Sequence, residues 1–266
     1  MNDRTAPAAA SPPVDSDMAN LARGGRLNAF GFALRLAARL PFLFIAGRMY
    51  GAEQLGRFAY AVLTVEFAAQ LAALGLRRGI PQLLANAKKD EACIVADAML
   101  IALLGSIVGM AILFIFPKAM YPTTPVGGLD RWLVITVIAI AWTDIALAAL
   151  AYHHDVASTV RARSIVEPWT ISIVAFLWAY VSLDDGLIIS YVFSMVAALV
   201  AALVPLVKCY GIPHGWKPDL GSAWRTAWRN GPLAAADAVE WASRRVDLAV
   251  LGAFMPASFV GIYYVA

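Results

Sequence analysis

The sequence carries few charges for its length. Only 15% of its 266 residues are Asp, Glu, Lys or Arg, whereas 61% are hydrophobic and the mean hydropathy is +0.69. A soluble domain averages about 25% charged and about 45–50% apolar residues, so a packed core of this size does not accommodate the excess. The composition therefore predicts an integral membrane protein in contact with the lipid bilayer. The net charge of +3 is small, and we expect no nucleic-acid partner.

Cysteine and histidine, which often act as nucleophiles, bases or metal ligands, are also scarce. The two cysteines, Cys93 and Cys209, lie far apart at predicted cytoplasmic helix ends, which argues against a disulfide. The three histidines form no metal-ligand pattern: His153, His154 and His214. The sequence has neither a glycine-rich phosphate loop nor a nucleophile beside a base. We therefore expect no metal site, no cofactor and no ATP hydrolysis, and we do not expect an enzyme.

The N-terminal segment has no long apolar run. Residues 1–20 are rich in Ala, Pro, Ser and Asp and lack the apolar core of a signal peptide. This composition is typical of a disordered segment. We predict that residues 1–26 form a disordered tail and that the first apolar helix stays in the mature protein.

Apolar segments make up most of the rest of the chain. A helix needs about 20 apolar residues to span a bilayer. The candidate segments are Leu27–Met49, Gly56–Leu76, Ile94–Phe116, Trp132–Tyr152, Val166–Val181, Leu187–Val207 and Gly231–Met255. The fifth is short, and the seventh contains several charged residues. An eighth begins near Phe259 and is interrupted at Ala266, so we expect the chain to be part of a longer protein.

The distribution of cations predicts the orientation of these helices. Most of the 21 lysines and arginines fall in the N-terminal tail or in the loops after the second, fourth and sixth candidate helices. Only Arg48, Arg57, Lys118 and Arg131 fall on the alternate side. Because loops rich in Lys and Arg stay in the cytoplasm, we predict a cytoplasmic N-terminus.

Four regions follow from this pattern. After the tail, residues 27–207 form a first transmembrane lobe of six helices, and residues 231–266 begin a second lobe. A cytoplasmic linker, residues 208–230, joins them. In this linker Trp224 and Trp228 are four residues apart, so the segment is either an interfacial helix or a simple anchor before the seventh helix.

Two parts of the chain align with each other at an offset of 205 residues. The segments are Phe44–Ala61 and Ala249–Ala266, without a gap. Gly47, Ala52, Gly56 and Ala61 match Gly252, Ala257, Gly261 and Ala266. The same offset places Arg39 on Arg244. Because six helices separate the two copies, both have the same orientation, and a pseudo-twofold axis would run along the membrane normal.

Three stretches resemble a known family. They are Gly51–Tyr60 (GAEQLGRFAY), Leu74–Ile80 (LGLRRGI), and Arg245–Gly252 (RVDLAVLG) followed by Val260–Tyr263 (VGIY). In these the sequence resembles the polysaccharide-export (Wzx-type) flippases of the multidrug/oligosaccharidyl-lipid/polysaccharide exporter superfamily. The resemblance implies an all-α membrane transporter of 12–14 helices in two lobes around a charged cavity. It also implies a bacterial inner (plasma) membrane, a polyprenyl-diphosphate-linked glycan as cargo, and other polysaccharide assembly proteins as partners.

Arginines at membrane depth are the first candidates for a site. Inserting an ionisable residue at that depth costs about 2.5–3.5 kcal/mol on insertion scales, so such a residue is a candidate for a functional role. Arg35 and Arg39 are one helical turn apart, and Asn28 falls on the same face. Two guanidiniums side by side suit the oxygens of a diphosphate. Either these residues line a substrate cavity, or the arginines pair with Glu66 or Asp144 and stabilise the lobe.

Further charges lie on three other predicted helices. Glu66 and Asp144 are counter-ions to the arginines or coupling-ion sites for protons or sodium. On the seventh candidate helix, Glu240 and Arg244 are spaced for an ion pair, and Asp237 lies one turn before Trp241. Arg244 either binds the same substrate as Arg39 or belongs to a self-neutralised helix surface.

Three functions are compatible with this sequence. The first is export of a lipid-diphosphate-linked oligosaccharide by alternating access. The second is a cation-coupled small-molecule or drug antiporter that depends on Asp144 or Glu66. The third is a membrane enzyme of glycan assembly, which the short predicted outer loop at residues 117–131 disfavours.

Overall fold

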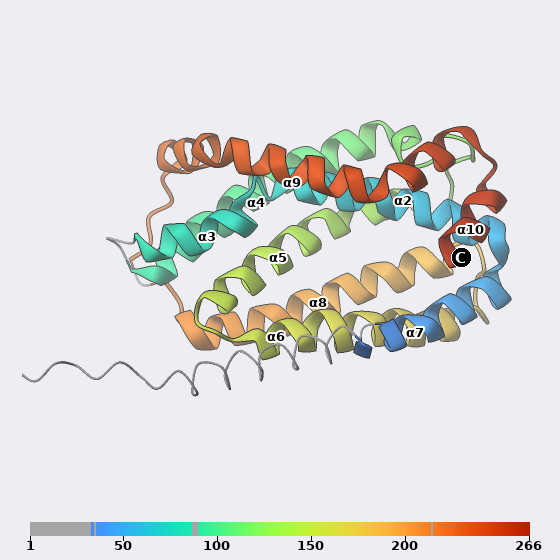
Figure 1. Cartoon of the computed structure of the whole chain (residues 1–266), viewed down its shortest axis with the longest axis horizontal. Helices are drawn as coiled ribbons and strands as arrows, with labels where there is room; N and C mark the ends of the chain where they lie inside the picture. The colour runs from blue at the N-terminus through green and yellow to red at the C-terminus, as the bar shows by residue number, and fades with distance from the viewer. Residues whose placement is uncertain (1–32, 35, 87–89, 214) are drawn as a thin grey trace, which may run out of the picture.

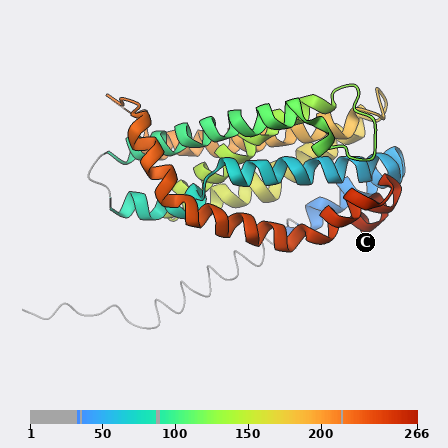
Figure 2. The ribbon, with the colours of Figure 1, turned by 90° about the horizontal axis from the view of Figure 1, so that it is seen from above.

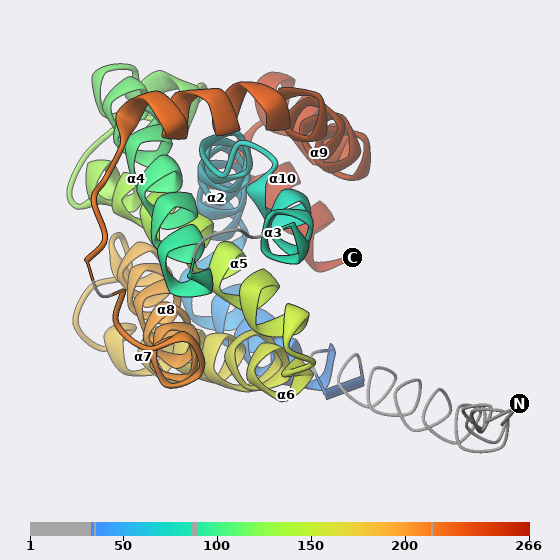
Figure 3. The same ribbon diagram turned by 90° about the vertical axis from the view of Figure 1, so that its left-hand side faces the viewer.

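The described part of the chain is all helical (Figure 1). The computed structural model describes residues 33, 34, 36–86, 90–213 and 215–266, and none of these forms a strand. Seen from one end, α5 (Thr136–Tyr152) lies in the middle of the bundle (Figure 3). It packs against α2, α4 and α8, and its candidate membrane span is 72% buried.

The first described helix turns back at Gly51. Residues 36–45 are α-helical and continue into η1, a π-helix at Ala46–Tyr50. Gly51 has φ +82°, which favours glycine, and α2 (Gly51–Ala72) starts there and runs back along the bundle (Figure 1). Gly56, where the second helix was predicted to begin, therefore lies inside α2. The start of the predicted helix Leu27–Met49 lies outside the described residues.

A short helix that the sequence analysis missed follows α2. Leu74 and Gly75 have φ of +48° and +68°, and α3 (Leu76–Ala85) begins directly after them. The prediction of a loop after Leu76 was therefore wrong. Leu76, Ile80 and Leu84 repeat every four residues and are buried, which accounts for this short amphipathic helix.

Three predicted helices are found with small shifts of their ends. They are α4 (Glu91–Ile115), α5 with the preceding 3₁₀ segment η3 (Asp130–Ile135), and α8 (Gly186–Tyr210). The Asp90 side chain caps α4 by accepting a hydrogen bond from the backbone N–H of Ala92. A second 3₁₀ turn, η2 (Pro117–Ala119), follows α4.

The fifth helix is longer than predicted. It comprises α6 (Val156–Val160), the π-helical η4 (Arg161–Val166) and α7 (Glu167–Trp178), which follow one another without a break. Asp155 caps its start by accepting from the backbone N–H of Ser158. The predicted start at Val166 was wrong because the arginines before it were assigned to a loop.

The linker segment with Trp224 and Trp228 and the predicted seventh helix form one element. α9 (Leu220–Phe254) contains both, and α10 (Ala257–Val265) follows it. Pro232 lies inside α9, and Figure 2 shows the first part of α9 running in a different direction from the rest. A proline inside a helix removes one hydrogen bond and is a usual cause of such a bend.

Four stretches are long and apolar enough to cross a membrane. They are Leu36–Ala85, Glu91–Ile115, Asp130–Tyr152 and Gly186–Tyr210. The stretch Leu36–Ala85 comprises the helix before Gly51, α2 and α3. Many large apolar side chains of α4 and α8 are exposed, among them Ile112, Phe114, Phe193 and Val200. Such a surface needs lipid around it, which agrees with a membrane protein. The predicted spans Val166–Val181 and Gly231–Met255 are not among the four.

Two glycines allow α2 and α10 to cross at close range. A Cβ atom on Gly56 would collide with the backbone of Ala257, and a Cβ on Gly261 would collide with the backbone of Ala52. The contact is reciprocal. The 205-residue offset equates Gly56 with Gly261 and Ala52 with Ala257, so each glycine lies against the alanine of the other aligned segment. Small residues of this kind let membrane helices approach closely.

We predict that Gly56→Ala destabilises the protein. The added methyl group has no space, and overpacking of this kind costs about 1–3 kcal/mol. The thermal unfolding midpoint in detergent micelles measures the effect. Gly47→Ala is the matched control, because a Cβ there has no neighbour within 4 Å. Equal midpoints for the two variants would contradict the close crossing.

Candidate functional site

A cavity of about 340 Å³ lies among α2, α5, η4, α7, α8 and α9. Four arginines and three carboxylates line it, which is an unusual concentration of charge for so apolar a chain. The charged residues are Arg39, Arg77, Arg163, Arg245, Glu66, Asp144 and Glu167. Gln70, Tyr191 and Trp241 add polar atoms to the same wall.

Arg163 connects the two carboxylates on one side of this cavity. Its guanidinium forms ion pairs with Asp144 on α5 and with Glu167 on α7, the latter at 2.8 Å. Gln70 donates a longer hydrogen bond to Asp144, at 3.4 Å. The side chains of Arg163 and Asp144 are only 19% and 15% exposed. The arginine therefore neutralises charges that would otherwise lie unpaired in the protein interior.

Glu66 lies on another side of the cavity. Arg245 on α9 is 3.6 Å from its carboxylate, and the Tyr191 hydroxyl donates a hydrogen bond of 3.4 Å to it. Glu66 thus links α2 to α8 and α9. Glu66 and Asp144 were predicted from the sequence, whereas Arg163, Glu167 and Arg245 were not. The spacing of four residues between Arg163 and Glu167 is the signal that was available.

Arg39 lies between this cavity and a second one. The second cavity has a volume of about 350 Å³ and is also lined by Arg244, Arg245, Asp247 and Tyr263. Within the described part of the chain, no carboxylate lies within 4.0 Å of the Arg39 guanidinium. The expected pairing of Arg39 with Glu66 or Asp144 is therefore not found there.

The structure describes Arg244 but not Arg35 and Asn28, the other residues predicted to bind the substrate. Arg244 lines the second cavity with Arg39 and also pairs with Glu240 at 2.7 Å. Arg35 and Asn28 lie outside the described residues. The proposal that they share a face with Arg39 stays a prediction.

Asp237 and Glu240 line neither cavity. Arg78 on α3 forms ion pairs with both of them, and Arg77 is 3.7 Å from Asp237. The Asp237 side chain is buried, whereas that of Glu240 is 41% exposed. These contacts attach α3 to α9, so the structure gives the two acids a role in packing and does not bring them to Glu66 and Asp144.

No family model, curated protein or solved structure matches the chain. Across residues 33, 34, 36–86, 90–213 and 215–266, no group of three or more His, Cys, Asp or Glu is placed to hold a metal ion.

We predict that Arg163→Gln strongly destabilises the protein. It leaves Asp144 and Glu167 without their cation, and breaking a buried ion pair in this way costs about 3–5 kcal/mol. The free energy of unfolding in micelles, measured with a chemical denaturant, tests this.

Arg161→Gln is the matched control for this prediction. Arg161 is an exposed arginine in the same π-helical segment, and the structure shows no ion pair for it within the described residues. Changing an exposed charge of this kind costs less than about 1 kcal/mol. If the two variants were equally stable, Arg163 would not be the residue that neutralises the cavity wall.

Proposed function

We propose that the chain takes part in moving a lipid-diphosphate-linked oligosaccharide across a membrane, for assembly of a cell-surface polysaccharide. The observation that carries the proposal is Arg39, which lines two adjoining polar cavities and has no carboxylate partner among the described residues. An arginine held beside open space in this way is available to a ligand with negative charge.

The charges around the first cavity favour phosphate over a neutral ligand. Asp144, Glu167 and Glu66 already have arginine partners, which removes most of their attraction for a cation. Among the arginines of the two cavities, Arg39 keeps a positive charge that no carboxylate of the described residues pairs with. A guanidinium presents a planar fork of donors that suits phosphate oxygens, and phosphate is the charged group between lipid and glycan in such a cargo.

The contact between α2 and α10 supports a two-lobe transporter. Residues of the two aligned segments meet reciprocally at Gly56 and Gly261, as expected near a twofold axis. Under this proposal the chain comprises a six-helix first lobe and the start of a second, repeat-related lobe of a 12–14-helix transporter. The two lobes then open alternately to each side of the membrane.

The contacts at one end of α4 bear on the proposed orientation in the membrane. The segments that follow α5 and α8 lie near the first part of α4, where His153 contacts Glu91 and the Trp216 indole donates to Asp97. We propose a multi-pass protein of a bacterial inner (plasma) membrane with a cytoplasmic N-terminus, acting with other polysaccharide assembly proteins.

A cation-coupled antiporter of small molecules is the second candidate. Three carboxylates around one cavity favour it, because protonation or sodium binding at Glu66 or Asp144 can be coupled to transport. The present ion pairs oppose it, since a coupling carboxylate must exchange its arginine for the transported cation.

We predict that Arg39→Gln abolishes export and that Arg39→Lys retains part of it. Glutamine removes the positive charge, whereas lysine keeps the charge but loses the planar fork of donors. The measurement is surface polysaccharide and accumulated lipid-linked repeat units in cells that carry the gene. Membrane levels of each variant are measured in parallel by immunoblot.

Arg48→Gln is the control, because Arg48 is an exposed arginine of η1, which neither cavity includes. Loss of export at normal membrane levels supports the proposed role of Arg39. Loss of the protein from the membrane would instead make Arg39 a structural residue. Normal export would count against the flippase and favour the antiporter.

A further inference from the structure

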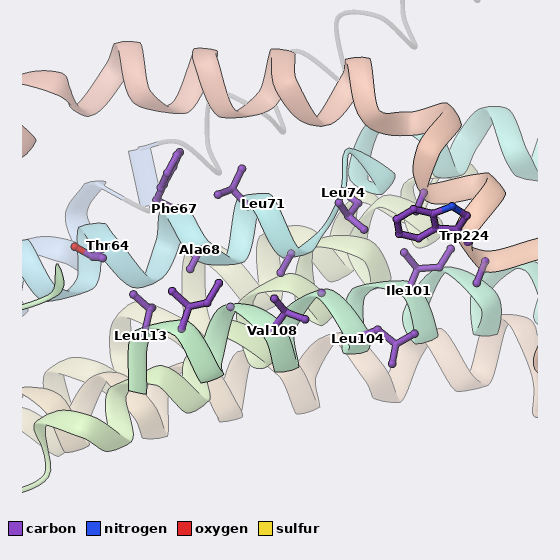
Figure 4. A pocket seen from close by; sticks show the side chains of 16 residues that line it. Thr64, Phe67, Ala68, Leu71, Leu74, Ile101, Leu104, Val108, Leu113 and Trp224 are labelled. Atoms are coloured by element: carbon purple, nitrogen blue, oxygen red, sulfur yellow. The ribbon is translucent and has the colours of Figure 1, made fainter. Parts of the chain in front are cut away.

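A long apolar groove lies between α2 and α4, and none of the residues that line it is charged. Its volume is about 730 Å³, and α2, α4 and the first part of α9 form its walls (Figure 4). Phe67 and Leu71 project from α2, whereas Val108 and Leu113 project from α4. Trp224 of α9 lies across one end, near Leu74 and Ile101 (Figure 4).

Small residues on two helices create the hollow. A Cβ on Gly105 would collide with the backbone of Ala72, so α2 and α4 are in close contact there. One turn further along α4, Gly109 lies beside Ala68, and a Cβ there would have space at 3.7–3.8 Å from its neighbours. The small residues therefore form the bottom of the groove, and larger side chains form its edges.

The groove has the length and direction of a lipid chain. It extends along α4 from Ile101 to Leu113, which is about 18 Å at the rise of an α-helix. α4 is itself one of the stretches apolar enough to span a membrane, so the groove runs into the bilayer from its Trp224 end. Leu104 and Val108 are 42% and 59% exposed, so hydrocarbon from outside the chain can reach it.

The Trp224 end carries features of a membrane surface. Trp224 and Trp228 are 69% and 77% exposed, and their ring centroids are 6.3 Å apart. Arg225 and Arg229 are exposed next to them, and no carboxylate of the described residues lies within 4.0 Å of either guanidinium. Exposed tryptophans beside arginines are typical of a helix at the lipid headgroups.

We propose that this groove is a binding site for one hydrocarbon chain of an anionic phospholipid, whose phosphate contacts Arg225 and Arg229. The groove supplies apolar contact along the chain, and the two arginines supply charge complementarity at its mouth. A neutral phospholipid would fill the groove but would not gain from the pair of cations. This site is separate from the proposed cargo site and does not depend on it.

Photo-crosslinking of the full chain in lipid vesicles tests the proposal. Phosphatidylglycerol and phosphatidylcholine, each with a diazirine in one acyl chain, are compared at equal amounts, and the labelled peptides are identified by mass spectrometry. We expect phosphatidylglycerol to label α2 and α4 in the groove preferentially. The outer face of α8, which includes Val196 and Val200, provides the reference for general lipid contact. Equal labelling of groove and reference by both lipids would overturn the proposal.

Paired variants separate the two parts of the site. Val108→Trp fills the groove and should remove its labelling, whereas Val200→Trp on α8 should not. Arg225→Gln and Arg229→Gln should each reduce the preference for phosphatidylglycerol about five-fold, the effect of one arginine at an anionic membrane surface. Arg161→Gln should leave it unchanged.

Other outcomes count against the proposal. Labelling that persists in Val108→Trp, or a preference that survives loss of both arginines, would overturn it. Absence of labelling by either lipid would also overturn it and would indicate that protein covers the groove. Labelling is measured on the purified chain without transport, so failure of the export proposal would not alter the result.

Discussion

An ionised side chain that is removed from water must find a partner of opposite charge, and the interior of this bundle is organised by that requirement. Arg163 is the cationic partner of Asp144 and Glu167, and Arg245 is the partner of Glu66. Arg245 joins α9 to α2, which is distant in the sequence, and Arg163 joins the continuous helix of η4 and α7 to α5. The charges therefore hold α2, α5, α7 and α9 in a defined arrangement that apolar contacts alone would specify less well.

The pairing also determines what is left for a ligand. Three carboxylates in the polar cavity are matched, and Arg39 is the residue placed between two cavities without a carboxylate among the described residues. The same bundle has an apolar exterior on α4 and α8, where hydrocarbon is the natural neighbour. The molecule thus separates a charged interior from an apolar surface, the reverse of the usual soluble protein, and the proposed transport function uses that reversal.

The long apolar helices were predictable because their signal is local. α4, α5 and α8 were predicted within a few residues, since a run of apolar residues is enough to identify each one. α3 and α6 were missed for the opposite reason. Arg77, Arg78 and Arg161 suggested loops, and the partner of Arg78, Asp237, is distant in the sequence. A local pattern does not reveal such a pair.

The candidate site was predictable in part on the same grounds. Arg39, Glu66 and Asp144 were chosen because they are ionisable residues in apolar segments, and the structure places all three around one cavity. The ion-pair partners of Asp144 and Glu66, which are Arg163 and Arg245, lie in less apolar segments, where a charged residue does not stand out. Asp237 was chosen by the same rule but lies elsewhere, because α3 covers it.

The crossing of α2 and α10 has a consequence for the origin of the chain. Ala52 and Gly56 meet Ala257 and Gly261 through the same atoms in both directions. Two identical copies of one such segment could make this contact with each other, because each would present the same two residues to the other. Under the two-lobe proposal, a symmetric dimer would possess such a contact before any duplication and fusion of its gene. Fusion would then free each copy to change on its own, as Arg39 and Arg244 illustrate, because only Arg244 has a carboxylate partner within the described residues.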